Sequence, residues 1–321
     1  MKNITQWLAI VLVILGAGVT AGFTQSVPAS VPVHPINFST RLGVGPLSYG
    51  TQAIAGFVVQ AGPNYKSGDT MTVLIRVIGP GLEQFLGPNV VNVDPMVQVY
   101  NQANTSTPIA QNNGWDGSAA TIATMASVGA FPLTVGSMDS VVILQLAPGA
   151  YTAVASTATD GPLGIFASGI ALTEVYDVSN QPDHCSFCNV STRTEAVYDP
   201  SGDEDVIVGF VLSGTGSTEM LLRGVGNSLY TFGINNYLGQ QTITLYDGQN
   251  AVMSDHWWTD GGASAVAALK AAFTATGAFQ LVDGSSDSAM LATLSAGPYT
   301  VVCTPKTGFG GQVLMEAYVV P

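Results

Sequence analysis

The run Val73-Leu74-Ile75-Arg76 returns later in the chain as Met220-Leu221-Leu222-Arg223, and a glycine follows each copy three residues on, at Gly79 and Gly226. Short apolar runs that are bounded by turn residues are typical of buried β-strands. Because the same strand-like run ends in the same way twice, it indicates that the chain contains two copies of one structural unit.

Five further segment pairs support this duplication, and they occur in the same order in both halves. Their offsets run from 142 residues (Thr173 to Met315) to 153 residues (Gly56 to Gly209). The pairs are 37–41 with 189–193, 56–59 with 209–212, 129–131 with 277–279, 148–152 with 297–300, and 173–176 with 315–318. We therefore expect repeat 1 at residues 36–178, a linker at 179–188, and repeat 2 at 189–321.

Most segments within each repeat have the length and composition of β-strands. Runs of four to nine residues are rich in Val, Ile, Thr and Tyr, and Gly, Pro, Asn or Asp bounds them. Such punctuation favours an antiparallel arrangement. The sequence therefore predicts an all-β protein of two tandem antiparallel β-sandwich domains, of jelly-roll or immunoglobulin-like type. Each domain should carry one short helix, at 118–128 and at 261–276, where apolar residues recur with helical spacing.

The composition limits the classes of function. Hydrophobic residues make up 47% of the chain and charged residues 9%, which excludes general disorder. Eight Lys and Arg residues stand against 21 Asp and Glu, for a net charge of −13. With so few cations to neutralise phosphates, we expect no binding to nucleic acid and no polybasic membrane anchor.

The first residues indicate export. Lys2 precedes an apolar run over residues 7–19, and small residues follow at Val19-Thr20-Ala21. The run is shorter than the roughly 20 residues that span a bilayer. We therefore expect a cleaved signal peptide at 1–21 rather than an uncleaved anchor, contact with the membrane only through that signal, and an extracellular or cell-surface location.

A proline-spaced segment, residues 22–35, follows the expected signal. Pro28, Pro32 and Pro35 disfavour helix and predict an extended arm. The arm is either a simple linker or a strand that pairs with a neighbouring subunit.

The motifs of repeat 1 resemble those of a family of uncharacterised tandem β-sandwich repeats in secreted and surface proteins of environmental bacteria. The resemblance rests on segments that cover nearly all of repeat 1, and repeat 2 departs from it at Gly226-Asn227 and Tyr318-Val319. The matching segments are Gly56-Phe57, 74–80, 112–116, 129–131, 148–152 and 174–177. The resemblance implies an extracellular module, and it implies no enzymatic activity.

No catalytic motif stands out, and we expect the protein not to be an enzyme. The three histidines lack zinc-protease spacing, and neither a nucleophile elbow nor a phosphate-binding loop is present. The few cations are instead duplicated. Arg76 and Arg223 occupy equivalent positions, as do Glu174 and Glu316. This duplication predicts a structural ion pair within each repeat.

The three cysteines, Cys185, Cys188 and Cys303, predict a structural disulfide, because an exported chain meets oxidising conditions. A Cys185–Cys188 bridge would rigidify the linker, whereas a Cys188–Cys303 bridge would pin the first strand of repeat 2. A zinc site and free thiols are the alternatives.

Two further segments are candidate binding sites. Asp199, Ser201, Asp203 and Asp205 place oxygen atoms at alternate positions, as calcium loops do. We expect a solvated acidic turn and no cofactor here, with calcium binding as the alternative. Trp257, beside His256, has no equivalent in repeat 1, where Gly114 aligns with it. An unshared tryptophan on a turn could contact a glycan or a protein partner, or it could be partly buried.

Together these features favour a secreted structural protein of the cell surface, which could assemble with itself into a filament or layer. The alternative is an extracellular carbohydrate-binding or adhesion module that recognises surface glycans.

Overall fold

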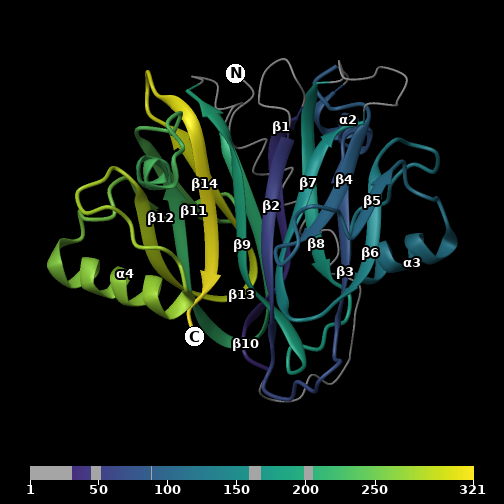
Figure 1. Cartoon of the computed structure of the whole chain (residues 1–321), viewed down its shortest axis with the longest axis horizontal. Helices are drawn as coiled ribbons and strands as arrows, with labels where there is room; N and C mark the ends of the chain where they lie inside the picture. Colours follow the sequence, from purple (N-terminus) through teal and green to yellow (C-terminus); the bar gives the residue numbers. More distant parts are fainter. Residues whose placement is uncertain (1–30, 45–51, 88, 159–167, 199–204) are drawn as a thin grey trace.

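The computed structural model describes residues 31–44, 52–87, 89–158, 168–198 and 205–321 (Figure 1). The described residues form fourteen strands and three α-helices, so the all-β prediction is confirmed. Repeat 1 contains β1 (His34–Val44), β2 (Gln52–Ala61), β3 (Met71–Ile78), β4 (Pro95–Asn101), β5 (Ala110–Asn113), β6 (Ser140–Leu146), β7 (Gly149–Thr157), β8 (Gly169–Asp177) and the helices α2 (Glu83–Leu86) and α3 (Ala119–Ser127). Repeat 2 contains β9 (Cys185–Val197), β10 (Val206–Val225), β11 (Gln241–Asp247), β12 (Asn250–Asp255), β13 (Ser288–Pro305), β14 (Gly310–Val319) and the helix α4 (Gly262–Thr276).

The two repeats share their strand pairings. Within repeat 1, β8 pairs with β1 and β3, and β7 pairs with β2 and β4. In repeat 2, β14 pairs with β9 and with the end of β10, and β13 pairs with the start of β10 and with β11. The long strands β10 and β13 thus each correspond to two consecutive strands of repeat 1.

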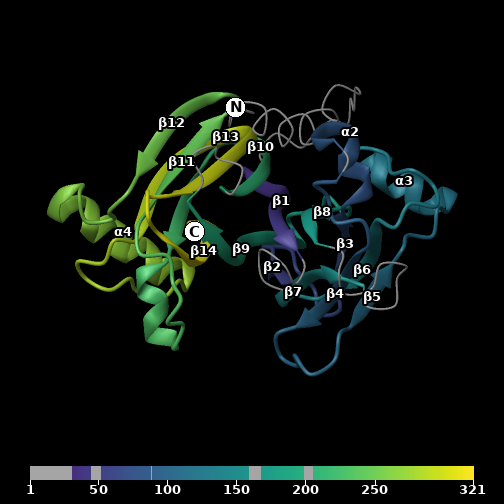
Figure 2. The same cartoon turned by 90° about the horizontal axis from the view of Figure 1, so that it is seen from above.

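The sheet is continuous across the repeats. Two tandem domains would not need strands of one repeat to pair with strands of the other, and here they do. Strand β1 of repeat 1 pairs with β10 of repeat 2, and β9 of repeat 2 pairs with β2 of repeat 1. All strands consequently belong to one antiparallel sheet (Figure 2). Because β9 already begins at Cys185, the segment that joins the repeats is shorter than the expected linker of 179–188.

The two cross-repeat ladders are equivalent to each other. Phe38 faces Phe210 in one ladder, and the equivalent residues Val190 and Phe57 face each other in the second ladder. Exchange of the repeats therefore maps each ladder onto the other, as an approximate two-fold rotation does. Thr40 and Thr192, which are equivalent residues, lie close to this axis, since their hydroxyl oxygens are 3.3 Å apart.

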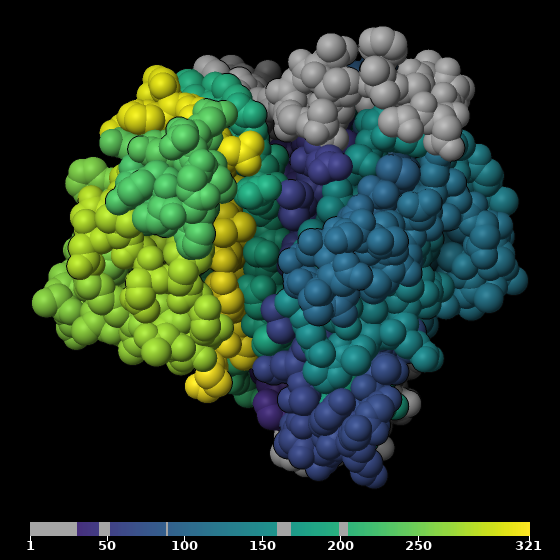
Figure 3. All heavy atoms as spheres, viewed as in Figure 1, coloured from purple at the N-terminus to yellow at the C-terminus, as the bar shows by residue number. Residues whose placement is uncertain are grey.

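An aromatic cluster fills the centre of the molecule, where the repeats meet. The ring centroid of Phe38 lies 4.9 Å from that of Phe187 and 5.8 Å from that of Phe57. All three rings are fully buried, and they come from β1, β9 and β2. Aromatic pairs at this spacing add to the stabilisation that burial of their area provides. In the space-filling view the two repeats accordingly form one body with no gap between them (Figure 3).

The helices α3 and α4 lie at opposite ends of the molecule, each against its own repeat (Figure 1). The core cluster beneath α3 contains Met125 and Trp115, and the cluster beneath α4 contains Phe273 and Trp258. One short helix per repeat was expected, at 118–128 and 261–276, and α3 and α4 confirm both, while repeat 1 has the additional single turn α2.

Steric crowding explains why a glycine follows the duplicated arginine strand in both repeats. A Cβ atom on Gly79 would lie 1.8 Å from the carbonyl oxygen of Asn92, and one on Gly226 would lie 2.1 Å from that of Leu238. In both repeats the backbone of a following loop therefore packs directly on this position, and only glycine fits.

The described end of the N-terminal arm packs against its own chain. The Thr215 amide donates to the Val31 carbonyl oxygen at 3.0 Å, and the Val33 side chain is buried in the core. Residues 1–30, which include the expected signal peptide and the rest of the arm, lie outside the described residues. Among the residues that the structure describes, no helix is long and apolar enough to span a membrane.

The cross-repeat ladders generate a prediction about isolated repeats. Residues 31–184 and 185–321, produced separately, should show no cooperative thermal unfolding, because each would expose the unpaired edges of two strands. Mixed and refolded together, they should form a one-to-one complex whose circular dichroism matches that of the full chain. If either half alone unfolded cooperatively near the melting temperature of the full chain, the repeats would be independent domains.

Candidate functional site

In the described part of the chain, a buried ion pair joins neighbouring strands in each repeat, as the duplicated charges predict. Arg76 on β3 donates from Nε to Glu174 Oε2 on β8 at 2.9 Å, and its Nη2 donates to the same oxygen. Arg223 on β10 donates to Glu316 Oε2 on β14 from Nε at 2.8 Å and from Nη2 at 2.6 Å. Both guanidinium groups are fully buried. A lone buried charge would be costly, so each residue depends on its partner.

A tyrosine and a phenylalanine complete each ion pair. The Tyr176 hydroxyl donates to Glu174 Oε1 at 2.8 Å, and Arg76 Nη1 donates to the carbonyl oxygen of Phe131 at 2.7 Å. The Arg76 guanidinium also lies 4.6 Å from the centroid of the Phe131 ring. Repeat 2 has the equivalent contacts. The Tyr318 hydroxyl donates to Glu316 Oε1 at 2.6 Å, and the Arg223 guanidinium lies 4.4 Å from the centroid of the Phe279 ring.

The electrostatics of this cluster oppose chemical use. Burial is the main cause that raises the pKa of Tyr176 well above its usual value, and the nearby Glu174 carboxylate is the second. Burial works against the charge of Arg76, but attraction to Glu174 leaves the pKa of Arg76 raised. The tyrosine therefore stays neutral and the arginine stays charged, which suits a structural role. Sequence reasoning identified the Arg and Glu but missed the tyrosines and phenylalanines, although both recur in the repeated motifs.

A second duplicated network holds the turn after the arginine strand. In repeat 1 the Trp115 indole N–H donates to Ser137 Oγ at 3.2 Å, and that hydroxyl donates to Asp139 Oδ2 at 2.7 Å. Asp139 Oδ1 in turn accepts the Gly79 amide at 2.9 Å. In repeat 2 the same chain runs through Trp258, Ser285, Asp287 and Gly226. These buried aspartates are thus occupied by fixed hydrogen bonds.

The exposed turn of residues 256–260 is the candidate ligand-contact site. The Trp257 side chain is 44% exposed, whereas Trp115 and Trp258 are buried. The His256 ring stacks on the Trp257 ring at a centroid distance of 5.7 Å and an interplanar angle of 27°. His256 Nε2 lies 3.3 Å from Asp260 Oδ2, so a carboxylate orients the imidazole. Sequence reasoning singled out His256 and Trp257 but missed Asp260, which aligns with Gly117.

No disulfide forms among the three cysteines, all of which are described and are free thiols. Cys185 and Cys188 both lie on the extended strand β9, where three residues span about 10 Å, beyond the reach of a disulfide. Cys303 lies on β13, between β10 and β11, and not beside Cys188. Burial raises the pKa of all three thiols, to about 11 for Cys188. The thiols are therefore protonated at neutral pH and poorly reactive.

The proposed calcium ligands lie largely outside the description. Asp199, Ser201 and Asp203 are not among the described residues. Asp205 is buried at the start of β10, where its Oδ2 accepts the Thr304 hydroxyl at 3.0 Å. Within the described part of the chain, no group of three or more His, Cys, Asp or Glu side chains is arranged to hold a metal ion.

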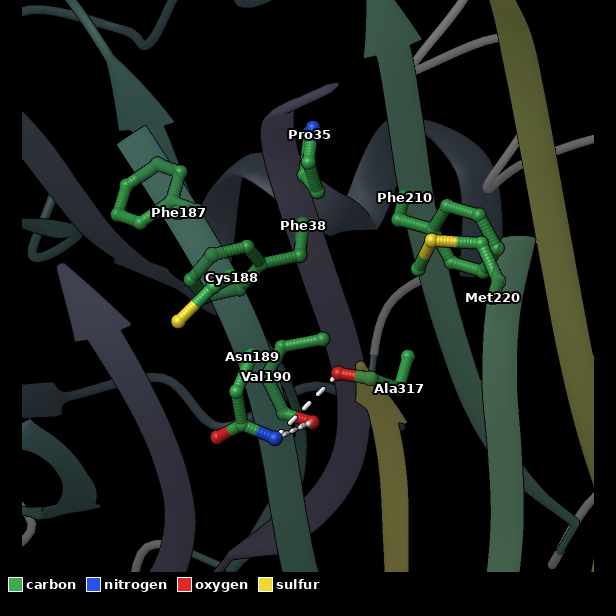
Figure 4. Close-up of a pocket in the computed structure, with 9 residues that line it drawn as sticks. All are labelled: Pro35, Phe38, Phe187, Cys188, Asn189, Val190, Phe210, Met220 and Ala317. Atoms are coloured by element: carbon green, nitrogen blue, oxygen red, sulfur yellow. Dashed lines mark hydrogen bonds between the residues drawn. The ribbon is translucent and has the colours of Figure 1, made fainter. Parts of the chain in front are cut away.

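A small apolar pocket lies at the junction of the repeats (Figure 4). Its walls include Phe38 of β1, Cys188 of β9, and Phe210 and Met220 of β10. The Asn189 side chain at its base is engaged, since Nδ2 donates to the Ala317 carbonyl oxygen at 3.3 Å. With its one polar side chain bonded to the backbone, the pocket offers little to orient a polar ligand.

Comparison with known proteins assigns no family. No family model matches the chain, and no curated protein matches it. Among solved structures, the M60 catalytic domain with the CBM51-1 and CBM51-2 domains from Clostridium perfringens ZmpB is similar at a TM-score of 0.20 and 6% identity, over 87% of this chain and 34% of that one. The infectious bursal disease virus Gx strain structure gives a TM-score of 0.13 and 9% identity, over 97% of this chain and 78% of that one. This chain thus spans about a third of the length of the first structure, and neither likeness is close enough to support an argument about function.

The buried ion pair predicts a strong effect of Arg76→Met. This change leaves Glu174 buried without its partner, so the free energy of unfolding should fall by about 3–5 kcal/mol. The double variant Arg76→Met/Glu174→Leu should recover most of that loss. Urea denaturation followed by fluorescence measures both values.

Arg193→Met is the matched control, since Arg193 is exposed on β9 and its loss should change stability by less than about 0.5 kcal/mol. An Arg76→Met variant as stable as the wild type would remove the ion pair from the account.

Asp177, at the end of β8, is a buried carboxylate whose ionisation should oppose folding. Burial raises its pKa to about 6, while the Asn180 amide donates to Oδ1 at 3.0 Å. Oδ2 is buried and has no hydrogen-bond partner. A carboxyl whose pKa is higher in the folded state favours folding below its unfolded pKa, and this contribution is lost as the pH rises through about 6.

We therefore expect Asp177→Asn to stabilise the protein at pH 8 by up to about 3 kcal/mol and to leave its stability at pH 4 nearly unchanged. Thermal unfolding of both proteins across this pH range provides the measurement. An equal shift at both pH values would show that the ionisation of Asp177 has no part in the effect.

Proposed function

We propose that this protein is an extracellular, non-catalytic structural protein of the cell surface that associates with further copies of itself. The fate of its buried charges supports this proposal. The Arg76–Glu174 and Arg223–Glu316 pairs and the buried aspartates Asp139 and Asp287 are all occupied by fixed, duplicated contacts. Groups held in this way stabilise a scaffold and are not free to act as catalytic acids or bases.

The architecture that accompanies this proposal is a pair of joined sandwich-like units. In repeat 1 the ladders group β1, β8, β3 and β6 in one run and β2, β7, β4 and β5 in another. We propose that these runs are the two layers of one unit, and that repeat 2 continues both layers. Such a rigid two-unit body suits a building block, because its ends keep a fixed geometry.

The observation that carries the proposal is the free edge of β6. In the described part of the sheet β6 pairs only with β3, and its register runs without a bulge from Ser140 to Leu146. The strand reads Ser-Val-Val-Ile-Leu-Gln-Leu, with neither charge nor proline. Ile143 is 39% exposed. Natural sheet edges usually carry lysine, proline or bulges that block pairing, and β6 has none of these.

Other edges of the sheet are less suited to pairing than β6. The equivalent edge in repeat 2, residues 288–295 of β13, pairs only with β10 in the described part of the sheet, but its exposed residues, Thr293 and Ser295, are polar. The opposite edge strand, β12, has a register shift beside Tyr246, and an irregular edge pairs poorly. The first residues of β6 are occupied, since the Val141 amide donates to Asn112 Oδ1 at 2.9 Å, so residues 142–146 remain for a partner.

A second copy of the chain is the partner that β6 suits best. Antiparallel pairing of two β6 strands about Leu144 would set Val142 opposite Leu146 and Ile143 opposite Gln145, with no charge on either strand. A chain with a net charge of −13 repels its copies over most of its surface, and this uncharged edge is where two copies can approach. Because so short a contact buries less than a standard interface of about 1,600 Å², we expect weak association that a high local concentration strengthens.

Self-association should depend on Ile143. At about 0.5 mM the wild type should show a mass above that of the monomer by sedimentation velocity. Ile143→Lys should lower the association constant at least about 10-fold, since it would place two ammonium groups diagonally across the same face of the new ladder.

Ile122→Lys is the matched control, because Ile122 is 42% exposed and lies on α3 rather than on β6. A wild type that stays monomeric at this concentration would contradict the proposed function. Association that Ile143→Lys leaves intact would contradict only the β6 contact.

A further inference from the structure

The turn of residues 256–260 differs from its counterpart in repeat 1 at the positions that face solvent. The shared framework is preserved, because the Trp115 amide donates to the Asp139 carbonyl oxygen at 2.8 Å and the Trp258 amide to that of Asp287 at 2.9 Å. Counting from these tryptophans, Asn113, Gly114 and Gly117 of repeat 1 correspond to His256, Trp257 and Asp260.

The backbone of the turn differs as well as its side chains. Gly114 and Gly117 both have positive φ angles, of 79° and 63°. Trp257 and Asp260 are not among the described residues with positive φ. The turn of repeat 2 has thus adopted a conformation that L-residues accept, and the turn of repeat 1 shows that the fold closes here without these three side chains.

The three added side chains form one exposed group. Trp257 is 44% exposed, and the side chains of His256 and Asp260 are 63% and 45% exposed. The imidazole stacks on the indole and is held 3.3 Å from the Asp260 carboxylate. The turn thus presents an exposed aromatic ring with hydrogen-bonding side chains beside it. Exposed side chains that contribute little to the core and yet are mutually ordered point to a ligand.

We propose that the turn of residues 256–260 binds a neutral or amino sugar. One face of a pyranose ring carries C–H groups, which stack on the Trp257 ring. Hydroxyl groups at the edge of the sugar donate to the Asp260 carboxylate, and the His256 imidazole contributes a further hydrogen bond. The carboxylate and the net charge of −13 disfavour uronic acids and sulfated sugars. The site is independent of self-association through β6.

The chain offers a direct optical test of this proposal. Of the three tryptophans in the described residues, only Trp257 is exposed, so protection of its fluorescence from acrylamide reports occupancy of the turn. The full chain would be titrated with soluble oligosaccharides of glucose, mannose, N-acetylglucosamine, glucosamine and galacturonic acid, and any binding would be confirmed by calorimetry.

We expect at least one neutral or amino oligosaccharide to protect Trp257, and galacturonic acid oligomers to bind at least about 10-fold more weakly. Trp257→Gly, which restores the residue of repeat 1, should lower the affinity by calorimetry at least about 10-fold, and Asp260→Gly should lower it several-fold. Tyr230→Ala removes a different exposed aromatic side chain of repeat 2 and should leave binding unchanged.

All three variants should keep the melting temperature of the wild type, because the altered side chains are exposed. The proposal is overturned if no oligosaccharide binds at about 10 mM, or if Trp257→Gly binds as well as the wild type. Retention of a cell-surface protein through Trp257, without any sugar binding, would also overturn it and would assign the turn to protein docking.

Discussion

Each repeat leaves one edge of its first two strands to be paired by the other repeat. Strand β1 is completed by β10, and β2 is completed by β9. Because an unpaired strand edge exposes backbone donors and acceptors, neither repeat satisfies its own hydrogen bonds alone. The two ladders are equivalent because the repeats are copies of one unit. If β1 of repeat 1 pairs with β10 of repeat 2, the equivalent strands β9 and β2 can pair in the same way. The central aromatic cluster of Phe38, Phe57 and Phe187 then packs where the two copies meet.

The duplicated polar networks sit outside this central core, one set beneath each helix. The Arg–Glu pairs join neighbouring strands within a repeat, and the buried aspartates hold the following turn. A buried ion pair is weak evidence for net stability. It does require that its two strands pair in one register, since any other alignment would leave an unpaired charge in the core. Together these networks specify how each repeat folds, whereas the cross-repeat ladders specify how the two repeats join.

The sequence revealed the duplication, the strand-rich class, the helices and the Arg–Glu pairs because each of these left a matching signal in both halves. It could not reveal the pairing of β1 with β10, because the partner of a strand edge is a three-dimensional property that no local pattern encodes. The cysteines misled for a similar reason: C-x-x-C spacing allows a bridge in a tight turn, but Cys185 and Cys188 lie on an extended strand. Asp260 was missed as a site residue because its part in the turn depends on its distance of 3.3 Å from the His256 ring, which the sequence does not show.

A scaffold of this kind can vary where the repeats differ or where an edge is free, and the turn around Trp257 and the strand β6 are the two such places for which we propose a role. The account depends on the two repeats folding as one cooperative unit, and native-state amide hydrogen exchange tests this most directly. The amides of β1 and β9 should exchange only through global unfolding, with the same free energy and denaturant dependence as those of β3 and β14. Exchange of either repeat through a separate opening, at a free energy lower by more than about 2 kcal/mol, would contradict the account.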